Sequence, residues 1–308
     1  MRPASAPEAA AALTRGITLL SVATAGVLVA IKGVVWLVSG SVALLASAAD
    51  SGLDLIASLV TLFAVRYAQV PPDAEHRFGH GKAEAFASLV QAGLVFASAA
   101  LIGQEAIRNI LDPKPVAHEA WAVAVMVVST VLTLALVSAQ GWVLRRTRSV
   151  AVAGDRAHYM TDLASNLIAL SGVAAAAWLG WLSLDAVAGL AVAALLLWAA
   201  VGVFREASGQ LMDQELPDED RARILELVRA DPRLSDVHQL RTRASGPFIH
   251  MQMHVDIDPA CTLEEAHRLI IAAEGRILTA FPQADILIHA DPRGRAEPHG
   301  GAFAQQAQ

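Results

Sequence analysis

The chain has 308 residues, of which 55% are hydrophobic and only 17% are charged. An ordinary soluble domain has fewer apolar residues and about a quarter charged residues, so this composition indicates a membrane protein. The net charge of −6 gives no support to nucleic-acid binding. The single cysteine, Cys261, excludes both an intrachain disulfide and a CxxC metal knot, so carboxylates and imidazoles must hold any bound metal.

The first two-thirds of the chain contain six apolar stretches, each long enough for the roughly 20 residues that a helix needs to cross a bilayer. They lie at residues 15–38, 42–68, 84–110, 119–144, 150–180 and 184–207. We therefore predict a six-helix transmembrane domain over residues 15–210, preceded by a flexible tail at 1–14. Lysine and arginine gather in the loops on one side of these helices, which predicts that both termini are cytoplasmic.

The last third of the chain is typical of a small aqueous domain. After Pro217 an amphipathic helical pattern is followed by two alternating segments around the turn Ser245-Gly246-Pro247, a second amphipathic helix and a third strand. The order αββαβ predicts a cytoplasmic α+β domain of ferredoxin-like type over residues 211–292. Residues 293–308 show no periodicity and are predicted to be a disordered tail.

Two pairs of ionisable residues lie within the apolar stretches, each pair four residues apart and so on one helix face. Asp50 and Asp54 belong to the second stretch, and His158 and Asp162 to the fifth. Each costs about 2.5–3.5 kcal/mol at membrane depth, which favours a shared ligand over isolated interhelical hydrogen bonds. Three oxygens and one nitrogen form a tetrahedral set that suits zinc, with cadmium and ferrous iron left open, whereas calcium or magnesium would want more oxygens.

A histidine ligand also predicts coupling to protons. His158 must lose its proton to bind metal, so metal binding releases protons and protonation expels metal. A site that opens alternately to the two sides of the membrane then exchanges metal for protons. The alternatives are a passive channel and a membrane-anchored metal sensor. An intramembrane protease is disfavoured because no HExxH motif is present.

Two further groups of metal-ligating side chains lie outside the apolar stretches. Asp73, His76 and His80 fall within eight residues of the loop after the second stretch and could ligate one zinc, although a solvated charged loop is the common alternative. In the last third, strand and helix positions of the αββαβ pattern can bring a larger set to one side, where it would bind metal and report its level. That set is His238, His254, His267, His289 and Asp291.

Several motifs together resemble those of the cation diffusion facilitators, in particular the bacterial zinc and ferrous-iron efflux proteins of the YiiP/FieF type. They are DSGLD at 50–54, DAEHRFGHGKAE at 73–84, HYMTD at 158–162, HQLRTRASGP at 238–247, HVDID at 254–258 and IHADP at 288–292. The resemblance covers about residues 15–292.

This resemblance implies a homodimer in a bacterial inner membrane that is not an enzyme and that antiports metal against protons by alternating access. It implies that the four helix residues form the transport site and that the loop and C-terminal groups bind regulatory or structural Zn²⁺. It further implies a charge interlock of Lys82 with Asp213. Manganese-transporting members typically carry asparagine in place of the histidine that corresponds to His158.

Overall fold

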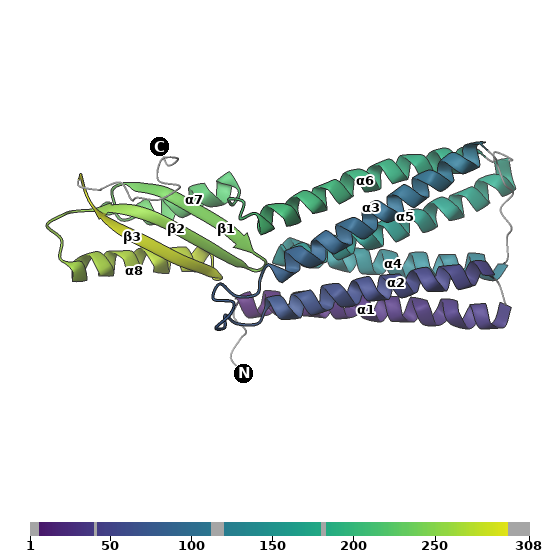
Figure 1. Ribbon diagram of the computed structural model, residues 1–308, viewed down its shortest axis with the longest axis horizontal. Coiled ribbons are helices and arrows are strands. Elements are labelled where there is room, and N and C mark those ends of the chain that lie inside the picture. The colour runs from purple at the N-terminus through teal and green to yellow at the C-terminus, as the bar shows by residue number, and fades with distance from the viewer. Residues whose placement is uncertain (1–5, 40–41, 112–119, 180–182, 295–308) are drawn as a thin grey trace. The chain divides into compact units, whose positions relative to one another are not determined.

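The computed structural model describes residues 6–39, 42–111, 120–179 and 183–294. They form two compact units, one containing Glu8–Ser208 and the other beginning at Gly209. In the described residues the first unit consists of six long helices (Figure 1). They are α1 (Ala6–Ser39), α2 (Val42–Ala68), α3 (Ala83–Leu111), α4 (Ala120–Thr147), α5 (Val150–Leu179) and α6 (Ser183–Leu211).

The helix boundaries lie within a few residues of the predicted ones, with one larger difference. α1 begins at Ala6 and so includes residues 6–14, which the sequence assigned to a flexible tail. The reason is local composition, because the segment Glu8–Leu13 is rich in alanine, the residue with the highest helix propensity. Most of the predicted C-terminal tail, residues 295–308, lies outside the described residues.

Five of these helices are long and apolar enough to cross a membrane: α1, α2, α3, α4 and α6. α5 has a similar length but is interrupted by Asp155, Arg156 and Asp162. It contacts α2, α3 and α4, so it lies inside the bundle rather than at its edge. The polar residues of α5 are therefore sheltered by neighbouring helices from the apolar surroundings.

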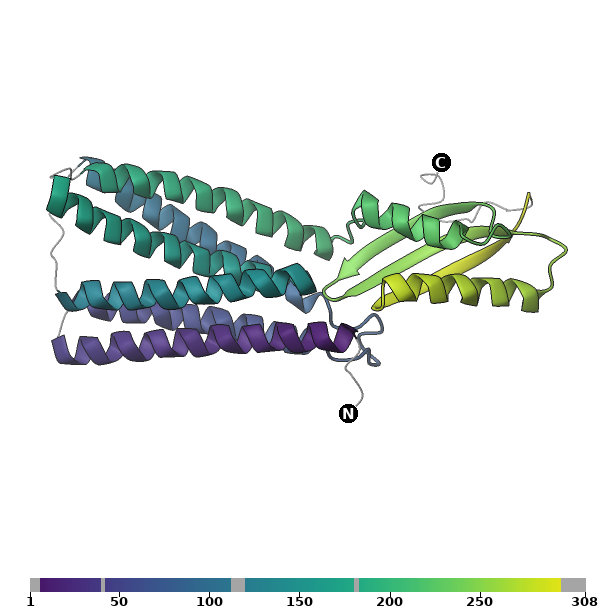
Figure 2. The same ribbon diagram turned by 180° about the vertical axis from the view of Figure 1, so that it is seen from behind.

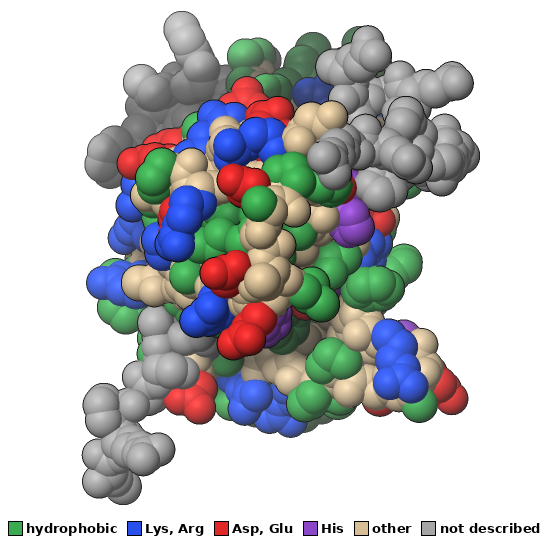
Figure 3. Space-filling view, turned by 90° about the vertical axis from the view of Figure 1, so that its left-hand side faces the viewer, with side chains coloured by type: hydrophobic (Ala, Val, Ile, Leu, Met, Phe, Trp, Pro, Cys, Tyr) green, Lys and Arg blue, Asp and Glu red, His purple; other side chains and the backbone are tan. Residues whose placement is uncertain are grey.

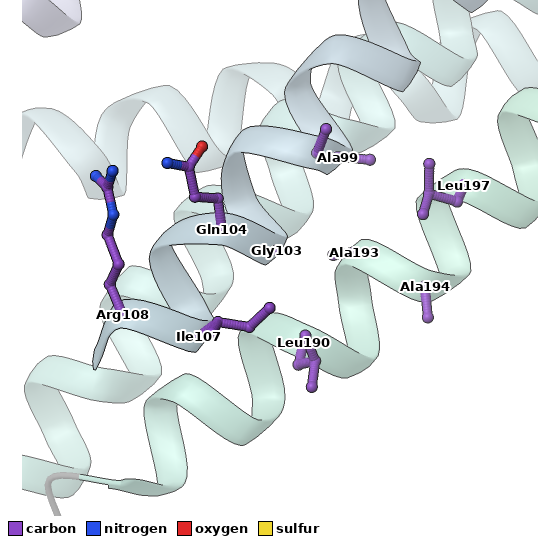
Figure 4. A pocket seen from close by; sticks show the side chains of 10 residues that line it. Ala99, Gly103, Gln104, Ile107, Arg108, Leu190, Ala193, Ala194 and Leu197 are labelled. Atoms are coloured by element: carbon purple, nitrogen blue, oxygen red, sulfur yellow. The ribbon is translucent and has the colours of Figure 1, made fainter. Parts of the chain in front are cut away.

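A groove of about 500 Å³ runs between α3 and α6 (Figure 4). Its walls include Ala99, Gly103, Ala193 and Ala194. A side chain at Gly103 would begin 3.6 Å from the Cβ of Ala193, which is ordinary van der Waals contact, so the two helices touch here.

The C-terminal unit has the predicted αββαβ order. It consists of α7 (Asp218–Arg229), β1 (Val237–Ser245), β2 (Phe248–Ile257), α8 (Leu263–Ala280) and β3 (Ala284–Pro292). The sheet has the order β1-β2-β3, with β1 and β2 antiparallel and β2 and β3 parallel. Both helices cover the same face of the sheet (Figures 1 and 2).

The core of this unit lies between the helices and that face. Met253 and Val255 of β2 and Ile288 of β3 pack with Leu269 and Ile277 of α8. Because side chains alternate along a strand, His254 and His289 project from the face opposite to α7 and α8. On the view of this unit in Figure 3, acidic and basic side chains are interspersed.

Candidate metal centres

One candidate centre lies inside the helical unit and combines residues of α2 and α5. Asp54, His158 and Asp162 each offer one ligand atom within 4.8 Å of the others. Nε2 of His158 lies 3.1 Å from Oδ1 of Asp54 and 3.9 Å from Oδ2 of Asp162. Asp54 and His158 are buried, and Asp162 is partly exposed. An imidazole nitrogen and two carboxylate oxygens are ligands that zinc accepts.

Asp50, the fourth predicted ligand, is not part of this cluster. It lies one helical turn before Asp54 on α2, and its side chain is exposed. Beside it, the buried Lys32 of α1 donates hydrogen bonds to Oγ of Ser51 at 2.6 Å and to the carbonyl of Ser47 at 3.3 Å. The role of Asp50 in metal binding therefore stays a prediction.

A second candidate centre lies in the loop between α2 and α3. Oδ1 of Asp73 is 3.5 Å from Nδ1 of His76, and Oδ2 of Asp73 is 3.4 Å from Nε2 of His80. The two imidazole rings lie 4.5 Å apart. All three predicted loop residues thus converge, and their ligand atoms lie within 4.8 Å of one another.

Backbone hydrogen bonds fix the positions of the Asp73 and His80 side chains in this loop. Oδ1 of Asp73 accepts backbone hydrogen bonds from His76 at 2.6 Å and Glu75 at 2.9 Å. The hydrogen bond from His76 is the main reason that the pKa of Asp73 lies below its ordinary value. Nδ1 of the buried His80 lies 3.3 Å from the carbonyl of Val70, an acceptor that favours a proton on Nδ1 and leaves Nε2 for metal. Glu75 is not part of the group.

The third candidate centre lies on the face of the C-terminal sheet opposite to α7 and α8. His238 of β1 pairs with His254 of β2, which in turn pairs with His289 of β3. The buried carboxylate of Asp291 lies 3.3 Å from His238, 2.9 Å from His254 and 3.3 Å from His289. Burial opposes ionisation of Asp291, but the hydrogen bond from His254 and the charges of the histidines outweigh it and lower its pKa.

A bulge in β1 accompanies this cluster. The register of β1 against β2 shifts between His238 and Arg241, and Gln239 has a positive φ of 51°. A bulge bends a strand and redirects its side chains, and here it directly follows His238.

His267, the fifth predicted member, is not brought to the C-terminal cluster within one chain. It is exposed on α8, and α8 covers the face of the sheet opposite to the histidines. Its role as a ligand stays a prediction.

The charge interlock predicted between Lys82 and Asp213 also stays a prediction. Lys82 belongs to the helical unit, whereas Asp213 belongs to the C-terminal unit. Asp213, in the C-terminal unit, lies 3.2 Å from Nη1 of Arg243.

The sequence reading missed a buried polar group beside the first centre. Asp155 of α5 is fully buried and accepts hydrogen bonds from Gln91 of α3 and Gln140 of α4. The signal was present in the sequence, because Asp155 precedes His158 by three residues and therefore lies on the same side of α5.

Known families match both units of the chain. The model of the cation efflux transmembrane domain matches residues 18–212, and that of the cation efflux protein cytoplasmic domain matches residues 216–293. The cation-efflux pump FieF of Serratia proteamaculans (strain 568) is 40% identical over 285 residues, which cover 92% of this chain and 94% of the relative. FieF of Escherichia coli (strain K12 / DH10B) is 39% identical over 277 residues, covering 89% and 91%.

Among solved structures, a zinc form of CzrB is 35% identical and covers 28% of this chain and 98% of that chain, with a TM-score of 0.25. The sequence matches confirm the resemblance drawn from the motifs, and they confirm that the homologues are transporters rather than enzymes. The chain is therefore an integral membrane protein that belongs to the cation efflux family.

Proposed function

We propose that this protein exports a divalent transition metal, first of all Zn²⁺, from the cytoplasm in exchange for protons. Cd²⁺ and Fe²⁺ are the other cations that this ligand chemistry accommodates. The observation that carries the proposal is the cluster of Asp54, His158 and Asp162 within the helical unit. Three ionisable side chains at membrane depth are costly unless they share a cation.

The same cluster supports exchange against protons. Nε2 of His158 lies within reach of two carboxylates, so a proton or a metal ion can occupy the space between them. Metal binding requires a neutral imidazole and ionised carboxylates, so each metal ion displaces protons, and protons displace metal. Alternating access of this one site to the two sides of the membrane converts that competition into antiport.

The helices, the loop cluster and the C-terminal cluster also have roles in this proposal. All six helices of the first unit span a bacterial inner membrane, with α5 sheltered by its neighbours and both termini in the cytoplasm. The protein acts as a homodimer. The loop and C-terminal clusters bind zinc from the cytoplasm, and their Asp-His-His and His-His-Asp donor sets fit that ion. Lys82 and Asp213 form the interlock that the family resemblance implies.

The test is zinc flux into liposomes containing the purified protein under an imposed pH gradient. Wild-type flux should follow the gradient, and Asp54→Ala and Asp162→Ala should abolish it. Glu105→Ala is the matched control, since it removes an exposed carboxylate of α3 whose partner, Arg108, is 3.9 Å away. This control should transport normally.

Each other outcome has a distinct meaning. Flux that ignores the gradient contradicts antiport and points to a channel. Flux of Fe²⁺ without Zn²⁺ keeps the mechanism and changes the substrate. No flux of any metal, with zinc still bound to the C-terminal cluster, contradicts the proposal and favours a membrane-anchored sensor.

A further inference from the structure

Asp155 is a second carboxylate buried in the helical unit, apart from the metal cluster. It lies on α5, three residues before His158, and only 1% of its surface is exposed. It is not one of the residues whose ligand atoms converge on the candidate metal site. The proposed transport mechanism gives it no role so far.

The hydrogen-bond donors around Asp155 come from four other helices and carry no charge, and they include the hydroxyl groups of Ser21 on α1 and Ser58 on α2. Nε2 of Gln140 on α4 donates to Oδ2 at 2.9 Å, and Nε2 of Gln91 on α3 donates to Oδ1 at 3.3 Å. Both glutamines are completely buried. These neutral hydrogen bonds fix the position of the carboxylate without neutralising an ionised form.

Asp155 forms no ion pair with a lysine or arginine of the described residues, and His158 is the nearby group that can carry a positive charge. The neighbouring Arg156 instead donates from Nε to the carbonyl of Val137 at 3.3 Å. An ionised carboxylate buried away from lysine and arginine is costly, so the charge near His158 decides whether Asp155 holds a proton.

The surroundings of Asp155, taken helix by helix, contain few titratable groups. α1, α2, α3 and α4 present the uncharged Ser21, Ser58, Gln91 and Gln140. The titratable groups nearby are His158 and Tyr159 of α5 itself and, from α2, Asp54 beyond His158. Only the metal cluster therefore supplies a charge that changes during transport.

The two glutamines can serve both protonation states of Asp155. Their Oε1 atoms are buried and have no hydrogen-bond partner among the described residues. With the carboxylate ionised, each amide donates from Nε2, as observed. With the carboxyl protonated, rotation of one amide presents Oε1 as the acceptor for the new O–H group.

Hydroxyl groups connect this site with the metal cluster. Nε2 of Gln140 also donates to Oγ of Ser21 at 3.1 Å. The hydroxyl of Tyr159 donates to the carbonyl of Ser21 at 3.2 Å and lies 2.7 Å from Oγ of Ser58. Ser58 lies one turn after Asp54 on α2, so a polar path leads from Asp155 to both helices of the metal site.

We propose that Asp155 is a proton-binding site of this transporter, separate from the metal ligands, which loses its proton when metal binds and regains it when metal leaves. The inference rests on the proposed exchange of metal for protons. A divalent ion bound near His158, three residues away, stabilises an ionised Asp155 across a medium of low dielectric constant. The proton leaves along the hydroxyl groups to water, and the ionised carboxylate offsets part of the metal's charge.

The test is infrared difference spectroscopy of the full chain in lipid bilayers, recorded with and without Zn²⁺. The wild type should lose a carbonyl stretching band of a protonated carboxylic acid on zinc binding, and Asp155→Asn should lack this band. Asparagine keeps the size of the side chain and still accepts hydrogen bonds. The proposal is wrong if the variant retains every wild-type band, or if the missing band responds neither to zinc nor to pH.

A second variant keeps the test decisive if Asp155→Asn does not fold. Gln140→Met removes one donor to the ionised form and should move the pH midpoint of the band upward. Ser138→Ala on the same helix should not move it, because Ser138 bonds only to the carbonyl of Leu134. Equal midpoints in both variants would overturn the proposal. Failure of antiport itself would appear separately, as wild-type zinc flux that ignores the pH gradient.

Discussion

His254 on β2 lies directly opposite His289 on β3 in the parallel part of the sheet, and their ring centroids are 4.8 Å apart. Both rings adjoin Asp291, whose carboxylate also reaches His238 of β1. One carboxylate therefore connects the histidines of all three strands.

Replacement of Asp291 by asparagine should remove metal from the C-terminal cluster, because it takes away the charged group that all three histidines share. We expect the number of zinc ions bound per chain, measured by equilibrium dialysis, to fall. His267→Ala should leave this number unchanged in a monomeric chain, since His267 is exposed on α8, away from the cluster. An equal loss in both variants would mean that His267 is a ligand after all.

Replacement of His158 by asparagine should change which metal the protein transports. The amide oxygen replaces an imidazole nitrogen, which zinc favours more than manganese does. We expect the initial rate of Zn²⁺ transport to fall at least about tenfold, equivalent to about 1.4 kcal/mol. Transport of Mn²⁺ should fall less, so the ratio of the two rates is the measurement. An unchanged ratio would show that His158 does not determine which metal the protein transports.

The loop centre should bind metal independently of transport. His80→Ala removes its buried imidazole and should lower the amount of zinc bound per chain while leaving zinc flux measurable. Arg77→Ala is the matched control, because it changes the charge of the same loop without touching the ligand group. Loss of flux in His80→Ala alone would show that this loop takes part in the transport cycle.

The N-terminus of α8 should depend on Thr262. Its hydroxyl accepts the N–H of Glu265 at 3.2 Å, and the Glu265 carboxylate accepts the N–H of Thr262 at 2.9 Å. Loss of such a cap costs about 1 kcal/mol, so Thr262→Ala should speed hydrogen exchange of the α8 amides roughly fivefold. Thr279→Ala, at an exposed position of the same helix, should have a smaller effect.

The same cap predicts a dependence on pH. The N–H and hydroxyl of Thr262 hold the pKa of Glu265 below its ordinary value. Its contribution to stability is therefore complete above the ordinary glutamate pKa of about 4.3 and is lost as the pH falls through the lower folded value. Acid should weaken the start of α8 in the wild type more than in Thr262→Ala. Parallel acid profiles would argue against the cap.

The sequence predicted the helices and strands well because each has a strong periodic signal. Apolar runs of membrane-spanning length located α2 and α4 to within a few residues, and alternation located the hairpin of β1 and β2. The start of α1 was not predicted, because its alanine-rich segment is not amphipathic and resembles a flexible tail.

The candidate sites were less completely predictable. Spacing of four placed Asp50 and Asp54 on one face of α2, but only the packing of α2 against α5 decides which of them meets His158. His267 has suitable chemistry, but its helix covers the other face of the sheet, which local sequence does not encode. Asp155 was overlooked because its partners, Gln91 and Gln140, lie far away in the chain.

The origin of the ligands also determines how the membrane site responds to movement. His158 and Asp162 are four residues apart on α5, so helix geometry fixes their spacing, whereas Asp54 belongs to α2. A rigid-body shift of α5 along α2 would change the coordination number of a bound ion and leave the pair on α5 intact. The affinity for the ion would then depend directly on the register between α2 and α5, and no other element would have to move.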